Sequence, residues 1–309
     1  MAKIGFLIGE AEVVTEGNCL YFTNVLIARG DAVFLCLVES LSLHKSLIKA
    51  RAAAVETPLQ AGQSLADLNF QPTPLDDMDL VWLLALGYRT TFLDKIQLLY
   101  NLSTKVRIVN SVDAIMYLKS KYLLSHNDLF SYPESYASND WEYLWEIIST
   151  EGGKWILKPP AGSFGRDVFV VGPQQSNTRA LLQNMTAHGT GQYCLMQRYV
   201  EEIAEGEKRV LFAGGQAVGQ YKRRAGTDHR TNVIQGARTE ACDLSDREID
   251  LCREIGRYLV GMGAEFAGVD MVFPYVIEFN VINPGGLHTI QELTGVNLAI
   301  EVINLILGE

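Results

Sequence analysis

The stretch VIEFNVINPGG, from Val276 to Gly286, reads as a buried β-strand that carries two polar side chains, Glu278 and Asn280. Side chains two residues apart on a strand point to the same face of the sheet. A carboxylate and a carboxamide therefore emerge together, and the turn-forming sequence Asn-Pro-Gly-Gly follows at once. The stretch predicts a strand that presents a polar pair beside a shaped loop.

A second strand is predicted just before it, at AGVDMVF, residues 267–273, and this strand carries Asp270. An odd number of residues in the turn around Pro274 would place Asp270 opposite Glu278, whereas a two-residue turn would send it to the other face. The odd turn is favoured because it leaves five apolar residues sharing the opposite face: Val269, Met271, Ile277, Phe279 and Val281.

Two carboxylates and one amide oxygen on one face suit a hard cation that keeps some of its waters and also binds substrate phosphates. This describes Mg²⁺ better than Zn²⁺. The structural alternative is the solvated face of an antiparallel sheet. The three residues together, next to the Asn-Pro-Gly-Gly loop, favour the metal site.

A magnesium site of this kind implies a nucleotide, so cationic partners for phosphate should lie elsewhere. Lys158 lies in the apolar run WILKPP, and Lys121 lies on a predicted helix. The glycine turn AGSFGRD, residues 161–167, could cover phosphates with its backbone N–H groups. Each feature has a plainer interpretation, a surface lysine or an ordinary hairpin turn. The sequence contains neither a P-loop nor a Gly-x-Gly-x-x-Gly dinucleotide motif.

Composition narrows the class of protein. The 309 residues include 36 acidic and 26 basic side chains, a net charge of −10, which argues against a protein that mainly holds nucleic acid. The five cysteines form no Cys-x-x-Cys pair, as expected for reduced thiols rather than a zinc site. The apolar runs are only strand-sized, so neither a signal peptide nor a membrane span is predicted, and we expect a cytoplasmic protein.

Hydrophobic periodicity predicts two kinds of sheet. The first third alternates apolar strand-sized runs with the helix-like stretch CLYFTNVLIARG, residues 19–30, which is typical of a parallel sheet with helical crossovers. Residues 51–77 read as a long surface connection. A helix capped by Ser111 follows Asn110, and glycine-linked strand candidates after it indicate antiparallel sheets. A helix over residues 245–262 then precedes the strand pair described above.

Taken in order, Lys121, ILKPPAGSFG, MQRYVEE, EGEKRVLF, HRTNVIQGA, GVDMVF and VIEFNVINP resemble the ATP-grasp superfamily and, more narrowly, bacterial glutathione synthetase. The resemblance extends from Asn110 to the end of the chain. It implies an α/β and α+β fold, with a Rossmann-like pre-ATP-grasp lobe over residues 1–112 and a two-lobed ATP-grasp domain over residues 113–309. A mobile lid would span about residues 121–200.

The same resemblance implies a role for each matching position. It implies ten nucleotide contacts, with backbone groups of residues 197–200 around adenine and residue 207 on the ribose: Lys121, Lys158, Gly162, Ser163, Gly165, Gln197, Arg198, Tyr199, Val200 and Glu207. It implies three catalytic residues facing the triphosphate and the reacting carboxylate: Arg209, Arg223 and Asn232. It implies the metal ligands Asp270, Glu278 and Asn280, with Asn283, Gly285 and Gly286 as substrate contacts that shape the acceptor pocket. Arg89 is the one residue that could substitute as a substrate contact where the chain departs from the family's N-terminal lobe.

The implied reaction joins a carboxylate to an amine with ATP and Mg²⁺, or Mn²⁺ in its place, through an acyl phosphate. Glutathione synthesis from γ-glutamylcysteine and glycine is the leading substrate assignment. The chain departs from the family at LLALGYRTT, where the family has Arg-Lys-Asp-Pro-Pro, and at Asn283-Pro-Gly-Gly, where it has Ser-Pro-Thr. A ligase for another amino acid or peptide, or a non-catalytic nucleotide-binding protein, therefore remains open. The expected partners are small-molecule substrates and further copies of the chain, without nucleic acid or membrane.

Overall fold

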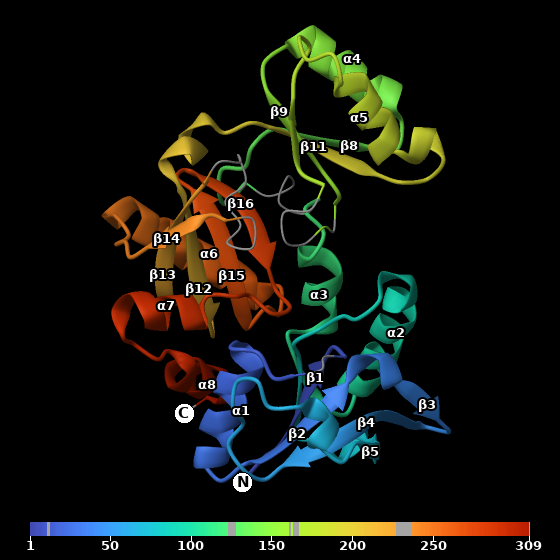
Figure 1. Ribbon diagram of the computed structural model, residues 1–309, viewed down its shortest axis with the longest axis vertical. Coiled ribbons are helices and arrows are strands. Elements are labelled where there is room, and N and C mark those ends of the chain that lie inside the picture. Colours follow the sequence, from blue (N-terminus) through green and yellow to red (C-terminus); the bar gives the residue numbers. More distant parts are fainter. Residues whose placement is uncertain (11–12, 123–127, 161, 163–166, 227–235, 309) are drawn as a thin grey trace.

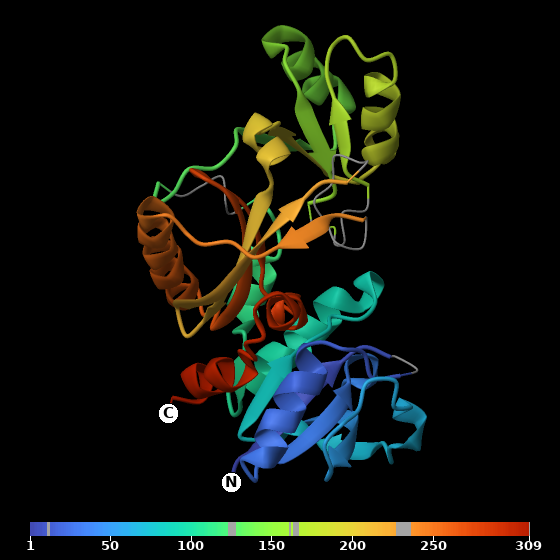
Figure 2. The ribbon, with the colours of Figure 1, turned by 60° about the vertical axis from the view of Figure 1, so that its left-hand side comes forward.

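The computed structural model describes residues 1–10, 13–122, 128–160, 162, 167–226 and 236–308. These residues form a mixed α/β structure with three sheets, of seven, four and five strands. The five-stranded sheet lies between the other two, and the four-stranded sheet stands at the far end of the molecule from the N-terminal sheet (Figures 1 and 2).

The N-terminal sheet has the order β3-β4-β2-β1-β6-β7, with β5 paired to β4. Its central strands run parallel, as the alternation of apolar runs and helix-like stretches predicted. The parallel strands and their two helices have these bounds: β1 Lys3–Ile8, α1 Asn18–Ala28, β2 Ala32–Leu37, β6 Leu80–Leu83, α2 Phe92–Ser103 and β7 Arg107–Val109.

The prediction of a surface connection over residues 51–77 was wrong. Strand β4, Leu47–Val55, runs into this segment and pairs antiparallel with β2, with β3 (Ser42–His44) and with β5 (Gln71–Pro74). Its second half, ARAAAV, has low strand propensity, yet Ala50, Ala52 and Ala53 are buried against the sheet. Cross-strand packing thus overrides the propensity that made the segment read as a loop.

Helix α3, Val112–Leu118, leads from the N-terminal sheet into the rest of the chain. The Ser111 hydroxyl accepts a hydrogen bond from the backbone N–H of Ala114 at 3.1 Å, which confirms the predicted cap. The helix ends at Leu118, earlier than its apolar pattern suggested. The predicted helical stretch SVDAIMYLKSKYLLS covers residues 111–125, and its last three residues, 123–125, lie outside the described residues.

The four-stranded sheet has the order β10-β9-β11-β8 and carries two helices on one side. Its elements are β8 Ser135–Ser138, α4 Trp141–Glu151, β9 Trp155–Lys158, β10 Phe169–Val171, α5 Thr178–Met185 and β11 Cys194–Arg198. It has a hydrophobic core of its own, built around Leu144, Ile148, Trp155 and Leu157. This sheet with its two helices is hereafter the small lobe.

The five-stranded sheet has the order β14-β13-β12-β15-β16 and is antiparallel throughout. Its strands are β12 Glu207–Ala213, β13 Gln216–Arg224, β14 Arg238–Glu240, β15 Phe266–Val272 and β16 Tyr275–Asn280. Helix α6, Asp246–Gly261, covers one face and begins with a capping box between Ser245 and Glu248.

Strands β15 and β16 bring Asp270 opposite Glu278, as predicted, but by another route. Val272 pairs with Tyr275, so the turn has two residues, and a register shift after Asp270 restores the face. The predicted apolar face was therefore wrong at one position. Val276 is fully buried in the core, whereas Ile277 is only partly buried.

The N-terminal and five-stranded sheets share one hydrophobic core. The rings of Phe22, Trp82 and Phe266 contact one another with centroids 4.7 to 5.6 Å apart. The C-terminal helices α7, Leu287–Thr294, and α8, Ala299–Leu307, complete this core, and α8 lies beside α1 (Figure 1). In the described part of the chain, no helix is long and apolar enough to cross a membrane.

Candidate functional site

One face of the five-stranded sheet carries a row of charged side chains. Strand pairing places Arg223 opposite Glu207, Arg209 opposite Asp270, and Asp270 opposite Glu278. Glu207 and Arg209 are two residues apart on β12, so they share a face with their partners. Five predicted site residues thus come together, on a regular antiparallel scaffold that fixes their spacing.

Four of these residues form a buried ion network. Arg209 donates two hydrogen bonds to the Asp270 carboxylate, from Nε to Oδ1 and from Nη2 to Oδ2, the second at 2.8 Å. Arg223 Nη2 lies 2.7 Å from Asp270 Oδ1 and donates to Glu207 Oε2 at 2.6 Å. The four side chains are 3 to 7% exposed. The two guanidinium groups and the two carboxylates neutralise one another, which offsets the desolvation cost of burying charged side chains.

The network also sets the protonation of its members. Burial alone would raise the pKa of the Asp270 carboxyl, but Arg209 and Arg223 outweigh it and hold that pKa well below its usual range. Asp270 is therefore a fixed carboxylate. The Nε of Arg223 is buried and has no hydrogen-bond partner among the described residues. A buried donor without a partner is costly, so this N–H is suited to an anionic ligand.

Two lysines face this sheet from the other side of the site. Lys121, just after α3, has its Nζ 3.1 Å from Glu278 Oε1 and 3.2 Å from the Gly162 carbonyl oxygen, to which it donates. Lys158 on β9 donates to Gln197 Oε1 at 2.7 Å. Burial, with Lys121 beside it, lowers the pKa of Lys158 to about 8. Both lysines are buried, with exposed fractions of 5% for Lys121 and 7% for Lys158.

The predicted metal ligands fit a hard cation by their chemistry. Asp270, Glu278 and Asn280 supply oxygen donors from one sheet face, and Asn280 donates its Nδ2 to Asp270 Oδ2 at 3.3 Å, which leaves its Oδ1 for a cation. No group of three or more His, Cys, Asp or Glu side chains gathers around one point in the described residues.

The predicted adenine-binding connection leaves the small lobe after β11. The side chain of Arg198 is held within the small lobe: its guanidinium lies 3.7 Å from the Trp155 ring centre and pairs with Glu134 and Glu151. This fits a backbone role rather than a side-chain role at that position. Val200 is buried where the connection enters a 3₁₀ turn.

The loop after β16 is held by the N-terminal lobe. Asn18, the first residue of α1, donates its Nδ2 to Asn283 Oδ1 at 2.7 Å and to the Pro284 carbonyl at 2.9 Å. The hydroxyl of Tyr21, on the same helix, lies 2.9 Å from His288 Nδ1. Sequence reasoning missed Asn18, because 265 residues separate it from its partner and no local pattern signals the contact.

The two predicted loop glycines, Gly285 and Gly286, play different structural parts. The Gly285 carbonyl accepts a hydrogen bond from Arg209 Nη1 at 3.1 Å, so the loop is joined to the ion network. Gly286 has φ 147°, and a Cβ there would come within 3.2 Å of Leu211 and Tyr221. Only glycine fits that position without displacing the core beneath the loop.

Arg89 lies in a 3₁₀ turn, Arg89–Thr91, at the start of α2, and is exposed. The residue before it, Tyr88, donates its backbone N–H to Glu39 and accepts from Lys95 Nζ at 3.1 Å through its carbonyl. Glu39 and Lys95 also pair directly at 2.7 Å. The turn is therefore anchored, although it reaches the surface. Ser163, Gly165 and Asn232 lie outside the described residues.

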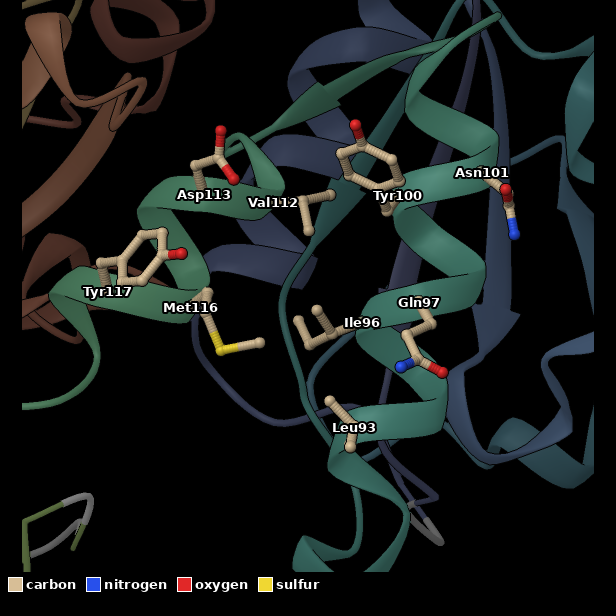
Figure 3. Close-up of a pocket in the computed structure, with 9 residues that line it drawn as sticks. All are labelled: Leu93, Ile96, Gln97, Tyr100, Asn101, Val112, Asp113, Met116 and Tyr117. Atoms are coloured by element: carbon tan, nitrogen blue, oxygen red, sulfur yellow. The ribbon is translucent and has the colours of Figure 1, made fainter.

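A separate cavity of about 520 Å³ lies between α2 and α3. Figure 3 shows it lined by Leu93, Ile96, Gln97, Tyr100, Asn101, Val112, Asp113, Met116 and Tyr117. Of the predicted site residues that the structure describes, none is among these lining residues.

Comparison with known proteins gives a consistent result. Residues 122–295, more than half of the chain, match the family described as "Prokaryotic glutathione synthetase, ATP-grasp domain". The glutathione synthetase of Gloeobacter violaceus is 25% identical over 315 residues, which cover 98% of this chain and 95% of that protein. The glutathione synthetase of Brucella melitensis is 28% identical over 278 residues, covering 88% and 86%.

Among solved structures, the RimK domain protein ATP-grasp from Sphaerobacter thermophilus superposes with a TM-score of 0.69. Its sequence is 19% identical, and the match covers 99% of this chain and 100% of that one. At this identity the likeness shows the fold alone, a multi-lobed ATP-grasp architecture.

Proposed function

The chain belongs to the prokaryotic glutathione synthetase family of ATP-grasp proteins and is an ATP-dependent C–N ligase, and on that premise we propose that it joins γ-glutamylcysteine to glycine. The main support for the proposal is that two pairs of cationic side chains lie on opposite sides of one site. Arg209 and Arg223 lie on the large sheet, and Lys121 and Lys158 lie opposite them.

In the first step, ATP transfers its γ-phosphoryl group to a substrate carboxylate oxygen, giving an acyl phosphate and ADP. Lys121 and Lys158 bind the phosphates, and the unpartnered Nε of Arg223 donates to the oxygens that gain charge. Asp270, Glu278 and Asn280 would hold Mg²⁺, which when bound supplies further charge neutralisation on the phosphates.

In the second step, the amine attacks the carbonyl carbon of the acyl phosphate, loses a proton and expels inorganic phosphate. Arg209 is fixed by Asp270 and the Gly285 carbonyl, so it offers a preorganised positive charge to the tetrahedral intermediate. The loop from Asn283 to Gly286, tied to Asn18, lines the side from which the amine enters. No covalent protein nucleophile is needed.

A ligase for a different acid and amine is the second candidate. Two departures from the family sequence favour it. The segment LLALGYRTT, with Arg89 as its lone arginine, stands where the family has Arg-Lys-Asp-Pro-Pro, and Asn283-Pro-Gly-Gly follows the proposed metal ligands where the family has Ser-Pro-Thr. Both features concern the acid and amine subsites and leave the ATP-binding half of the proposal unchanged.

The test is ADP release from Mg-ATP with γ-glutamylcysteine and glycine, beside a panel of other acids and amines. Turnover that requires both peptide and glycine supports the proposal. Turnover only with another pair would replace the substrates and keep the ligase chemistry. Glu278→Gln serves as the inactive control, because it removes one proposed metal charge with little change in volume.

A further inference from the structure

One polar side chain on the charged sheet face is not among the residues that the motifs assign. Tyr221 lies on β13 two residues before Arg223, and strand pairing places it opposite Arg209 on β12. Side chains two residues apart on a strand share a face, and directly paired residues of neighbouring strands share that face too. Tyr221 therefore lies on the face that carries the ion network, beside both of its arginines.

The Tyr221 ring joins the hydrophobic core to the ion network. Only 3% of the residue is exposed, and it belongs to the core cluster that includes Leu211, Leu287 and Ile290. The ring also lies against Gly286, since a Cβ at that glycine would come within 3.2 Å of Tyr221 Cε1. Cε1 adjoins the ring carbon that bears the hydroxyl, so the hydroxyl end of the ring lies next to the loop after β16.

Arg209 reaches the same loop. Its Nη1 donates a hydrogen bond at 3.1 Å to the carbonyl of Gly285, the residue before Gly286. Arg209 and the Tyr221 hydroxyl thus approach one short stretch of the loop, the first from β12 and the second from β13. This is the side of the site from which the amine enters in the proposed mechanism.

The Tyr221 hydroxyl makes no hydrogen bond in the part of the chain that the structure describes. A tyrosine hydroxyl in a protein interior usually finds a partner, as the partly buried Tyr132 does by donating to the Lys121 carbonyl at 2.9 Å. Arg209 does not serve as that partner, because its Nε and Nη2 donate to Asp270 and its Nη1 to the loop. A phenylalanine would fill the same space without an unused donor, so the hydroxyl is available to a bound ligand.

Two fixed donors near one point suit an oxygen that gains negative charge during the reaction. When the amine attacks the acyl phosphate, its nitrogen bonds to the carbonyl carbon and the C=O π pair moves onto the carbonyl oxygen. When the intermediate collapses, the C=O bond forms again and the bond to the phosphate oxygen breaks, so inorganic phosphate leaves with that electron pair. The charge on the carbonyl oxygen is therefore specific to the second step.

We propose that the Tyr221 hydroxyl donates a hydrogen bond to this oxygen, together with Arg209, while the tetrahedral intermediate exists. The inference rests on the proposed function, because it adds a catalytic residue to the second step of that reaction. The hydroxyl keeps its proton throughout, and the proton that the amine loses goes to solvent. The first step, in which ATP is cleaved, does not involve Tyr221.

The test is Tyr221→Phe, which keeps the ring and removes only the hydroxyl. In a single turnover with Mg-ATP, γ-glutamylcysteine and glycine, stopped by rapid quenching, ADP should form at the rate of the parent protein. The amide product should form about 100-fold more slowly, the loss typical of removing one oxyanion donor. The melting temperature should not fall, because the lost hydroxyl has no hydrogen bond in the described part of the chain.

Tyr258→Phe is the matched control. Tyr258 lies on α6, which covers the other face of the same sheet, and its ring contacts Phe130 and Phe279. This variant should form ADP and amide at the rates of the parent protein. An equal slowing of amide formation in both tyrosine variants would overturn the inference, because the loss would not be specific to the charged face.

Amide formation at the parental rate in Tyr221→Phe would also overturn it, and so would an equal slowing of ADP and amide formation. A lower melting temperature with unchanged amide formation would assign the hydroxyl to stability alone. Failure of the substrate assignment is separable, because the hydroxyl binds an oxygen that every acyl phosphate contains. If γ-glutamylcysteine and glycine do not support ADP release, the same comparison is made with the acid and amine that do.

Discussion

Asp270→Asn separates two roles that the structure gives to one carboxylate. Asp270 balances two buried guanidinium groups, and it is also a proposed metal ligand. Asparagine keeps the size and one oxygen but removes the charge. Glu207 still balances Arg223, so the variant leaves the single positive charge of Arg209, whose side chain is 8% exposed, without a carboxylate.

The cost follows from that uncompensated charge. Removing one partner of a buried ion pair destabilises a protein by about 3 to 5 kcal/mol. A chain of this size loses about 2 °C in Tm per kcal/mol, so Asp270→Asn should melt about 6 to 10 °C below the parent. Glu278→Gln is the matched comparison: the Glu278 side chain is 28% exposed, and glutamine can still accept from Lys121. That variant should cost about 1 kcal/mol or less.

The assay is calorimetric melting of both variants without ligand, followed by ADP release with Mg-ATP. Both variants should lose turnover, and only Asp270→Asn should lose stability. Equal melting temperatures for Asp270→Asn and the parent would refute the reasoning that the ion network is a structural element. Full turnover in either variant would refute its assignment as a metal ligand.

Three other predictions concern separate parts of the molecule. Because the pKa of Lys158 is lowered to about 8, its side chain loses the proposed phosphate-binding ammonium form as the pH rises from 7 to 9. ATP affinity, measured by calorimetry, should therefore fall over that range in the parent protein but not in Lys158→Arg. A flat pH profile in the parent would contradict the assigned contact. Val276→Ala should destabilise by about 2 kcal/mol and Ile277→Ala by less than about 1 kcal/mol in urea unfolding; the reverse order would mean that the register shift is misplaced. Gly87→Ala should raise the KM for the acid several-fold and leave the KM for ATP unchanged, since it displaces only the Arg89 turn; an unchanged acid KM would show that the anchor is irrelevant.

Local patterns predicted the parts of the fold that local physics decides. The Ser111 cap, the helix after Ser245 and the parallel centre of the first sheet follow from residues close together in sequence. The facing of Asp270 and Glu278 was also predicted, but from an odd-numbered turn that would have placed Ile277 on the apolar face. The structure reaches the same facing with a two-residue turn and a register shift after Asp270, and Val276 is buried in place of Ile277.

Contacts between distant segments could not be predicted. Nothing near Arg209 in the sequence shows that its guanidinium is shared between Asp270 and the Gly285 carbonyl. The anchor of the Arg89 turn joins Glu39 to Lys95 across 56 residues. The strand over residues 47–55 was missed because alanine carries little information about burial.

The core shared by the two ends of the chain constrains how the protein can be made. Helix α8 packs on α1, and Arg107 donates to the Ile306 carbonyl at 2.6 Å, so the first lobe to be synthesised needs the last helix to finish its interior. The small lobe, with a core drawn only from its own segment, has no such dependence. During translation, the small lobe can therefore reach its native packing before the N-terminal lobe has received the C-terminal helix that completes its core. This order is opposite to the usual N-to-C-terminal sequence of domain folding.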